Sequence, residues 1–283
     1  MRQQSNSFHN TKTYLDNIEF TDNQVNNRIL LKKVLPSLIN LDTSISIMLS
    51  TLSPEEYREY EKYVNIAIDS NISRLSSNGN ASIEIPKSNG SLLSDSFCSK
   101  IYAYHGGLLR IMNYMKTEII EENDSLFDLV MEIFEDMILG LYSTYCIHYV
   151  IYGLIMRTDS RLSGYISFLA NIVHGNDQRR IVASLCLGSL LKRLRHLSDE
   201  AREIVDEYIF DCKNRIISMN DGFSDVLLSQ LWSISENPVL AIDTATIPVE
   251  KEKIPVKVKT HLQGIACTRI EVYEAILEDE QNI

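Results

Sequence analysis

The chain has 283 residues, of which 45% are hydrophobic and 23% are charged, an ordinary balance for one large globular domain or two smaller ones. Its formal net charge of -11 argues against a general nucleic-acid binder, which carries a basic excess. The five cysteines are scattered and never spaced as Cys-x-x-Cys, so we expect reduced core thiols of an intracellular protein. The N-terminus has no apolar core, and we expect no signal peptide.

The first part of the chain predicts an arm followed by helices. Residues 1–22 are polar and rich in Asn, which indicates a flexible N-terminal arm, and we expect a single helical-repeat domain over 23–283. The apolar positions of 23–50 predict two helical stretches that bend near Pro36. A helix start follows, because Ser53 is a good N-cap, Pro54 suits the first turn and Glu56 completes a capping box. We expect that helix to end at about residue 70.

Residues 70–97 change character and predict a surface loop. Ser and Asn dominate there, and such a segment buries too little apolar surface to offset its ordering entropy. A tolerated insertion is one interpretation. The other is a surface regulated by phosphorylation, because phosphate on several serines would add much negative charge. The serines in question are Ser70, Ser73, Ser76, Ser77, Ser88, Ser91, Ser94 and Ser96.

From residue 97 onward the apolar periodicity is helical. It predicts helices near 98–119, 123–139, 141–157, 162–174, 178–197, 199–218 and 221–236. The short connections between them favour antiparallel neighbours, so the sequence predicts an all-α fold, an α-solenoid of HEAT-like helix pairs. Two prolines and an alternating Val-Lys pattern predict an extended linker over 239–260, and a last helix is expected near 262–279.

Residues 137–156 are long enough to need a membrane test. They form a run of 20 residues without a formal charge, about the length that crosses a bilayer. The run contains Ser143, Thr144 and His148, and Gly140 and Gly153 interrupt it. A pair of core helices would bury fewer polar groups in lipid than a spanning helix would, so we expect no membrane partner. A small membrane-associated helical protein remains a third hypothesis.

Motifs of enzymes are missing from the sequence. It contains no phosphate-binding loop, no dinucleotide fingerprint, no HExxH and no GxSxG. His105-Gly106-Gly107 is similar to an oxyanion-hole turn, but without a nucleophile elbow it is better explained as a helix bend. Cys146 and His148 are too few for a metal site without further ligands. We therefore expect no enzymatic activity, no cofactor and no metal.

Residues 178–197 form the most apolar predicted helix. Val182, Cys186 and Leu190 share one face with Leu194 and Leu197, and further aliphatic residues lie around it, so we expect burial on more than one side. Ser184 and Gly188, four residues apart, predict a shallow groove for another helix. Cations cluster at the two ends, where they either complement helix dipoles or form an edge that a large partner docks against. They are Arg179, Arg180, Lys192, Arg193 and Arg195.

The same stretch resembles the most recognisable motif of the RNA polymerase I-specific transcription initiation factors, the TIF-IA family. The matching positions are Arg180, Ala183, Leu187, Gly188, Ser189, Leu190, Leu191, Arg193, Arg195 and Leu197. Upstream, residues 148–152, Asp159 and Phe168-Leu169 are similar to further family positions, and residues 223–238 resemble the following helix with its Asn-Pro. The chain differs in having His148 where the family has Gln, and in being shorter than a typical member.

The resemblance implies a non-catalytic HEAT-repeat protein of the nucleus and its nucleolus. It would bind RNA polymerase I subunits and bridge them to promoter-bound core factor for ribosomal RNA synthesis, without sequence-specific contact to nucleic acid. Members of the family are phosphorylated at serine-rich surfaces and self-associate, so a homodimer is among the expected states. We take the five cations of 179–195 as the predicted polymerase contact, and Gly188 and Ser189 as packing residues. The alternative is a helical-repeat scaffold in nuclear transport or chromatin with no polymerase link.

Overall fold

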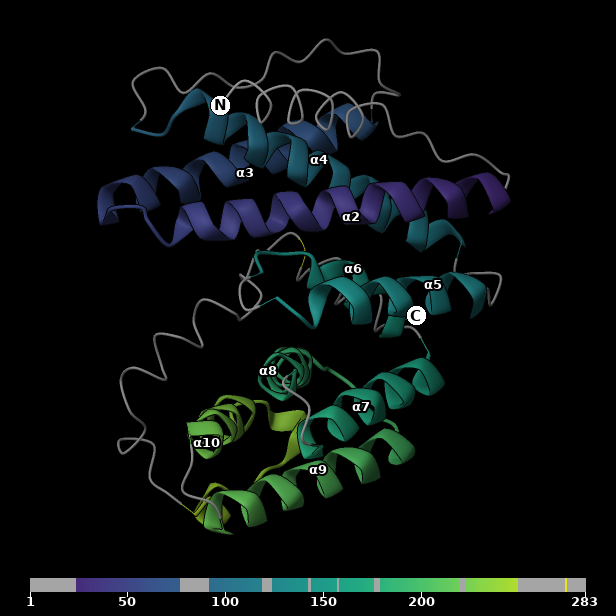
Figure 1. Ribbon diagram of the computed structural model, residues 1–283, viewed down its shortest axis with the longest axis vertical. Helices are drawn as coiled ribbons and strands as arrows, with labels where there is room; N and C mark the ends of the chain where they lie inside the picture. Colours follow the sequence, from purple (N-terminus) through teal and green to yellow (C-terminus); the bar gives the residue numbers. More distant parts are fainter. Residues whose placement is uncertain are drawn as a thin grey trace. The chain divides into compact units, whose positions relative to one another are not determined.

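The protein is helical throughout the part of the chain that the structure describes. This computed structural model describes residues 24–76, 92–118, 124–141, 144–156, 158–175, 179–218, 222–248 and Tyr273. No strand occurs in these ranges, which confirms the all-α class (Figure 1). The helices are α2 (Gln24–Leu49), α3 (Pro54–Ser76), α4 (Asp95–Glu118), α5 (Asp124–Ile133), the π-helix η2 (Phe134–Ile138), α6 (His148–Ile155), α7 (Asp159–His174), α8 (Arg180–Leu191), α9 (Asp199–Ser218), α10 (Gly222–Ile234), and the 3-10 turns η3 (Pro238–Leu240) and η4 (Thr244–Thr246).

The chain divides into two compact units, where the sequence predicted one domain over 23–283. The first unit is Met1–Ile133 and the second is Phe134–Ile283. The boundary falls where α5 passes directly into the π-helix η2, so no loop marks it in the sequence. The arm predicted at 1–22 and the helix predicted at 262–279 lie outside the described residues, apart from Tyr273.

In the first unit, α4 packs against both α2 and α3 (Figure 1). The two stretches predicted around Pro36 are one continuous helix, α2, with the proline inside it. Leu35 and Leu38, which flank the proline, are buried in the core of the unit. Because this burial holds the helix in place on both sides, the one backbone hydrogen bond that proline removes does not break it.

Two buried polar contacts fix how these three helices meet. Tyr104 Oη on α4 donates to Asp42 Oδ1 on α2 at 2.5 Å, and both side chains are fully buried. Asn71 Nδ2 on α3 donates to the carbonyl oxygen of Tyr102 at 3.2 Å. A Cβ on Gly106 would lie 2.6 Å from Asn71 Oδ1, so a glycine is needed there for close approach. His105-Gly106-Gly107, where the sequence predicted a bend of the helix, lie inside α4.

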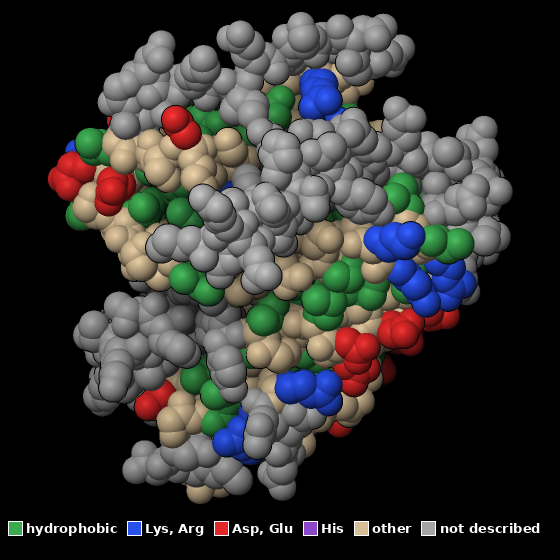
Figure 2. Space-filling model, turned by 45° about the horizontal axis from the view of Figure 1, so that its top comes forward, with side chains coloured by type: hydrophobic (Ala, Val, Ile, Leu, Met, Phe, Trp, Pro, Cys, Tyr) green, Lys and Arg blue, Asp and Glu red, His purple; other side chains and the backbone are tan. Residues whose placement is uncertain are grey.

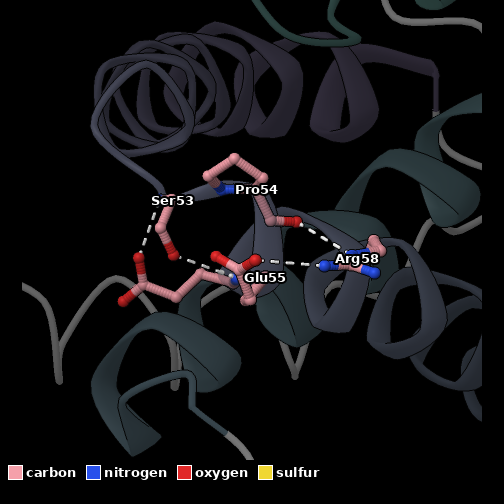
Figure 3. Close-up of polar contacts among 5 residues, drawn as sticks. Ser53, Pro54, Glu55 and Arg58 are labelled. Atoms are coloured by element: carbon pink, nitrogen blue, oxygen red, sulfur yellow. Dashed lines mark hydrogen bonds and ion pairs between the residues drawn. The ribbon is translucent and has the colours of Figure 1, made fainter.

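Helix α3 begins with the capping box that the sequence predicted. The Ser53 amide donates to Glu56 Oε2 at 2.8 Å, and the Glu56 amide donates to Ser53 Oγ at 3.3 Å (Figure 3). The bond from the Ser53 amide lowers the pKa of the Glu56 carboxyl below its usual range. Arg58 closes the same turn by binding Glu55 Oε1 at 3.2 Å and the Pro54 carbonyl oxygen at 3.3 Å. The start of α3 thus satisfies the amides of Ser53 and Glu56 locally.

The serine-rich loop is shorter than the predicted range 70–97. Helix α3 continues through Ser70, Ser73 and Ser76, whereas the sequence predicted its end near residue 70. The hydroxyls of Ser73 and Ser76 donate to carbonyl oxygens one turn back, which lets these residues stay helical. Ser94 Oγ accepts from the Phe97 amide at the start of α4, and Ser96 lies inside that helix. Ser77, Ser88 and Ser91 lie outside the described residues.

In the second unit, four helices form two crossed layers. Helix α7 packs against α8, and α9 packs against α10. In addition, α7 contacts α9 and α8 contacts α10. The two pairs therefore stack so that their first helices lie together and their second helices lie together. In Figure 1, α7 and α9 are seen from the side, whereas α8 and α10 are seen nearly end on. The helices of each pair therefore cross, where the sequence predicted antiparallel neighbours.

Three predicted segments of the second unit have different bounds in the structure. The helix predicted over 178–197 ends at Leu191, and among the described residues of the one predicted over 141–157 the helical segment is α6. The linker predicted as extended over 239–260 contains the 3-10 turns η3 and η4, where Asn237 and Asp243 cap the turns with their side chains. Residues 249–260 lie outside the described ranges. Among the helices that the structure describes, none combines the length and apolar character needed to cross a bilayer.

Replacing Ser53 with alanine should destabilise the chain by about 1 kcal/mol, because it removes the N-cap of α3. The matched control is Ser73→Ala on the same helix, where the hydroxyl only back-bonds to Asp69. We expect Ser73→Ala to be neutral or slightly stabilising, because alanine is the better helix former. Urea unfolding of both variants measures the difference. Equal unfolding midpoints for the two variants would contradict the capping role of Ser53.

Candidate partner-binding site around helix α8

Helix α8 is the central helix of the second unit. Every side chain of residues 182–191 is buried, and the helix packs between α7 and α10. Side chains of α6 also reach it, since Tyr152 Oη donates to the Cys186 carbonyl oxygen at 3.2 Å. The prediction that this helix is buried on more than one side is confirmed. Any partner-binding group of α8 must consequently come from its two ends.

Gly188 allows α10 to approach α8 closely. A Cβ built on Gly188 would lie 1.7 Å from Gln230 Oε1 and 2.8 Å from its Cδ. Gln230 belongs to α10 and is itself buried. This confirms that Gly188 forms part of a groove for another helix, and it explains why the position takes no side chain.

Two side chains outside α8 satisfy the carbonyl oxygens at its C-terminal end. Arg193 Nη1 donates to the Ser189 carbonyl oxygen at 2.9 Å and to Ser189 Oγ at 2.7 Å. Asn237 Nδ2 donates to the carbonyl oxygens of Leu191 at 2.7 Å and Leu194 at 2.9 Å. The carbonyl oxygens at the end of a buried helix cannot accept hydrogen bonds from water, so these two side chains donate to them instead. Leu194 and Leu197 are buried as predicted, but from the segment after the helix rather than from the helix.

A neutral histidine lies beneath this end of α8. Burial, with a smaller contribution from the nearby Arg193 cation, lowers the pKa of His148 to about 4. Thr144 Oγ1 lies 2.9 Å from the His148 Nε2, and the Cys186 sulfur lies 4.0 Å from both ring nitrogens. The structure thus brings Cys186 beside His148, and Cys146 is a buried free thiol. Within the described residues, no group of three His, Cys, Asp or Glu side chains could hold a metal ion.

The predicted contact cations have intramolecular interactions of their own. At the N-terminal end of α8, Arg179 pairs with Glu135 at 3.2 Å, and the Arg180 guanidinium lies 4.4 Å from the centre of the Phe223 ring. At the other end, Lys192 pairs with Glu236 at 3.3 Å. All these pairs are partly exposed, so water screens them and they contribute little stability.

Arg193 is half-buried, as Arg179 and Arg180 are, but its contacts differ from those of the other cations. Its guanidinium lies 5.6 Å from the centre of the Tyr149 ring and 5.9 Å from that of Tyr152, in addition to its bonds to Ser189. Arg195, two residues further on, is exposed. Arg193 therefore has the environment of a packing residue, whereas Arg195 has that of a surface residue.

The structure does not bring the five cations into one patch. Arg179 and Arg180 precede α8, and the other three follow it. A helix of 12 residues is about 18 Å long, so the two groups are separated by that distance. On the face drawn in Figure 2, Lys and Arg side chains in general lie in separate small groups. A partner that touches both groups must span the whole edge of the second unit.

Sequence reasoning missed the residues that hold α8 in place. Gln230 reads as an ordinary polar residue of a helix, and only the structure places it over Gly188. Asn237 is followed by a proline, which indicates a cap for the next turn, and its Oδ1 does accept from the Val239 amide at 3.0 Å. Its two bonds to the end of α8 join residues more than 40 positions apart, which no local pattern reveals.

Comparison with known proteins gives no relative for this chain. No family model, no curated protein and no solved structure matches it. The class that the fold and the α8 region define is therefore an all-helical protein of two compact units, with crossed and stacked helix pairs in the second.

Gly188→Ala should destabilise the second unit by about 1–3 kcal/mol, because the new methyl group overpacks against Gln230. Adding Gln230→Ala should recover part of the loss, since it removes the clashing amide. Gly164→Ala on α7 is the matched control, because a Cβ there meets no neighbouring atom. It should stabilise by about 0.5–1 kcal/mol through helix propensity. The close approach would be disproved if both glycine variants changed the free energy of unfolding equally.

Arg193→Ala should cost about 1.5–3 kcal/mol of stability, because it removes charge-assisted bonds to Ser189 and leaves the end of α8 short of a donor. Arg193→Lys should recover only part of it, since an ammonium group lacks the planar fork. Lys192→Ala, which loses one exposed ion pair, should change the free energy of unfolding by less than about 1 kcal/mol. Denaturant unfolding of the three variants measures these differences. A loss for Arg193→Ala no larger than for Lys192→Ala would contradict its packing role.

Proposed function

We propose that the chain is a non-catalytic protein-binding scaffold whose helix pairs are successive repeats of a short α-solenoid. The observation that carries this proposal is the stacking of the pair α7–α8 on the pair α9–α10, with first helices together and second helices together. In solenoids, each repeat contacts its neighbours in this way, and the stack presents long edges to partners.

The segment that precedes these four helices also contacts them. Helix α6 packs against α7, and Phe134 of η2 lies 6.3 Å, centre to centre, from the His148 ring of α6 and 5.6 Å from the Tyr165 ring of α7. Tyr152 of α6 binds the backbone of α8. Contacts from α6 therefore reach both helices of the pair α7–α8.

Within this class, we propose transcription initiation by RNA polymerase I as the specific function. The support is the resemblance of residues 180–197 to the polymerase I initiation factors. Several of the matching residues also lie at contacts of the central helix of the second unit. Gly188, Ser189 and Arg193 hold the central helix of the second unit in position. A motif built from such residues describes a way of packing, so it supports a common architecture more strongly than a common contact surface. The nucleus is the compartment that this proposal requires.

The contact surface that we propose is narrower than the five cations of the sequence prediction. The Arg193 guanidinium contacts Ser189 and two tyrosine rings, and that of Arg180 lies over the Phe223 ring. We therefore assign both side chains to packing within the unit. Arg179 and Lys192, whose ion pairs are partly exposed, and the exposed Arg195 remain the proposed contacts. Cations that reach the surface set partner choice and association rate more than affinity.

The experiment is affinity purification of the tagged intact chain from its own cells, with mass spectrometry of the co-purifying proteins. We expect polymerase I subunits, enriched over those of polymerases II and III. The variant Arg179→Ala, Lys192→Ala, Arg195→Ala should lose them, while Arg58→Ala with Lys62→Ala on α3 is a control that also removes exposed, paired cations. Circular dichroism checks that each variant folds.

Two results would contradict the proposal at different levels. Unchanged polymerase recovery by the triple variant would disprove the contact surface alone. A different stable partner without polymerase, such as a transport or chromatin protein, would disprove the polymerase function and leave the scaffold standing.

A further inference from the structure

Helix α9 carries the two most exposed large hydrophobic side chains of the described residues. Phe210 is 63% exposed and Ile217 is 72% exposed. They are seven residues apart, which is about two helical turns, so they lie on the same face about 10 Å from each other. Single exposed apolar residues are common, but an aligned pair on one helix face marks an interaction surface.

The same face is acidic toward the N-terminus of the helix. Glu203, Asp206 and Glu207 are exposed, and their spacing from Phe210 places them on the same face of α9. The helix dipole favours acids only in the first turn, where Asp199 and Glu200 already lie. The three later acids repel one another at spacings of three and four residues, which disfavours the helix slightly. A cationic partner would remove this repulsion.

The cations of α9 are directed to other parts of the unit. Arg202 donates to the Val239 carbonyl oxygen at 3.3 Å, and Lys213 bonds to Thr246 Oγ1. Arg215 donates to carbonyl oxygens at the end of α7 and lies 5.1 Å from the centre of the Phe223 ring. None of these contacts involves Glu203 or Asp206, so within the described residues the cations of α9 bind elsewhere than to the acidic part of the face.

We propose that this face of α9, the α9 stripe (Glu203, Asp206, Glu207, Phe210 and Ile217), binds a basic amphipathic helix of a partner protein. The partner helix would place two aliphatic residues, seven apart, against Phe210 and Ile217. Its lysines or arginines, one to two turns further on, would face the three acids. Helix-to-helix docking through apolar anchors with a charged flank is a common mode of peptide recognition. Charge complementarity then fixes the direction of the bound helix.

The charge of the stripe excludes other kinds of partner. An anionic membrane surface attracts basic segments and would repel these carboxylates. Nucleic acid is excluded for the same reason, because its phosphates bind cations. A metal ion does not account for Phe210 and Ile217, whose exposed hydrophobic area is what a protein partner would bury. A basic helix is the one partner class that uses both halves of the stripe.

The test uses a synthetic peptide of about 18 residues, long enough to form five helical turns. It consists of Ala and Lys with two Leu seven apart, and carries a fluorophore. A matched peptide has Glu in place of each Lys. Anisotropy titration with the full chain should show micromolar binding of the Lys peptide and none of the Glu peptide. Phe210→Ala with Ile217→Ala should weaken binding at least tenfold.

Charge reversal distinguishes the stripe from the general acidity of the chain. Glu203→Lys with Asp206→Lys should abolish binding of the Lys peptide and create binding of the Glu peptide. Glu61→Lys with Asp69→Lys on α3 changes the net charge equally at exposed positions and should leave the Lys peptide bound. Ile47→Ala on α2 is the matched apolar control, since Ile47 is also exposed. Circular dichroism confirms that the variants fold.

Two results would overturn the proposal. One is the absence of binding by the wild-type chain up to about 100 µM peptide, the range of weak peptide recognition. The other is an equal loss of binding in the stripe and α3 charge variants, which would show attraction to net charge alone. The assay contains no polymerase, so its outcome does not depend on the proposed function.

Discussion

A buried helix must have its end carbonyls satisfied by protein groups, and helix α8 meets this constraint with two side chains from outside itself. Arg193 binds the carbonyl oxygen of Ser189, and Asn237 binds those of Leu191 and Leu194. An unsatisfied buried carbonyl costs about 1–3 kcal/mol, so these donors decide where α8 ends. They also join the end of α8 to the segment after α10, which closes the second unit around its central helix.

The arrangement of the other helices follows from this central position. Gly188 removes the side chain that would keep α10 at a distance, and Tyr152 binds the α8 backbone from α6. Burial keeps His148 neutral, which allows it to lie beneath Arg193 without a second buried charge. Surfaces for partners are therefore left to the helix ends and to α9, whose outer face carries the exposed Phe210 and Ile217.

Local signals in the sequence were sufficient where the structure depends on local contacts. The capping box at Ser53 and the bounds of α9 were predicted from neighbouring residues and agree with the structure. The end of α8 was not predictable, because Leu194 and Leu197 continue the helical period, whereas the helix ends at Leu191 and Asn237 binds the carbonyl oxygens of Leu191 and Leu194. Likewise, the sequence identified Arg193 as one of several cations, but its packing on Tyr149 and Tyr152 needs α6 to be in place.

Hydrogen exchange of the intact chain, with and without Asn237→Ala, tests most directly whether the capped end of α8 organises the second unit. We expect the amides of 183–191 to exchange more slowly than those of any other helix in residues 134–248. Asn237→Ala should speed exchange first at 188–194, before α7 or α9 responds. Slower exchange in α9 than in α8, or an unchanged α8 in the variant, would contradict the account.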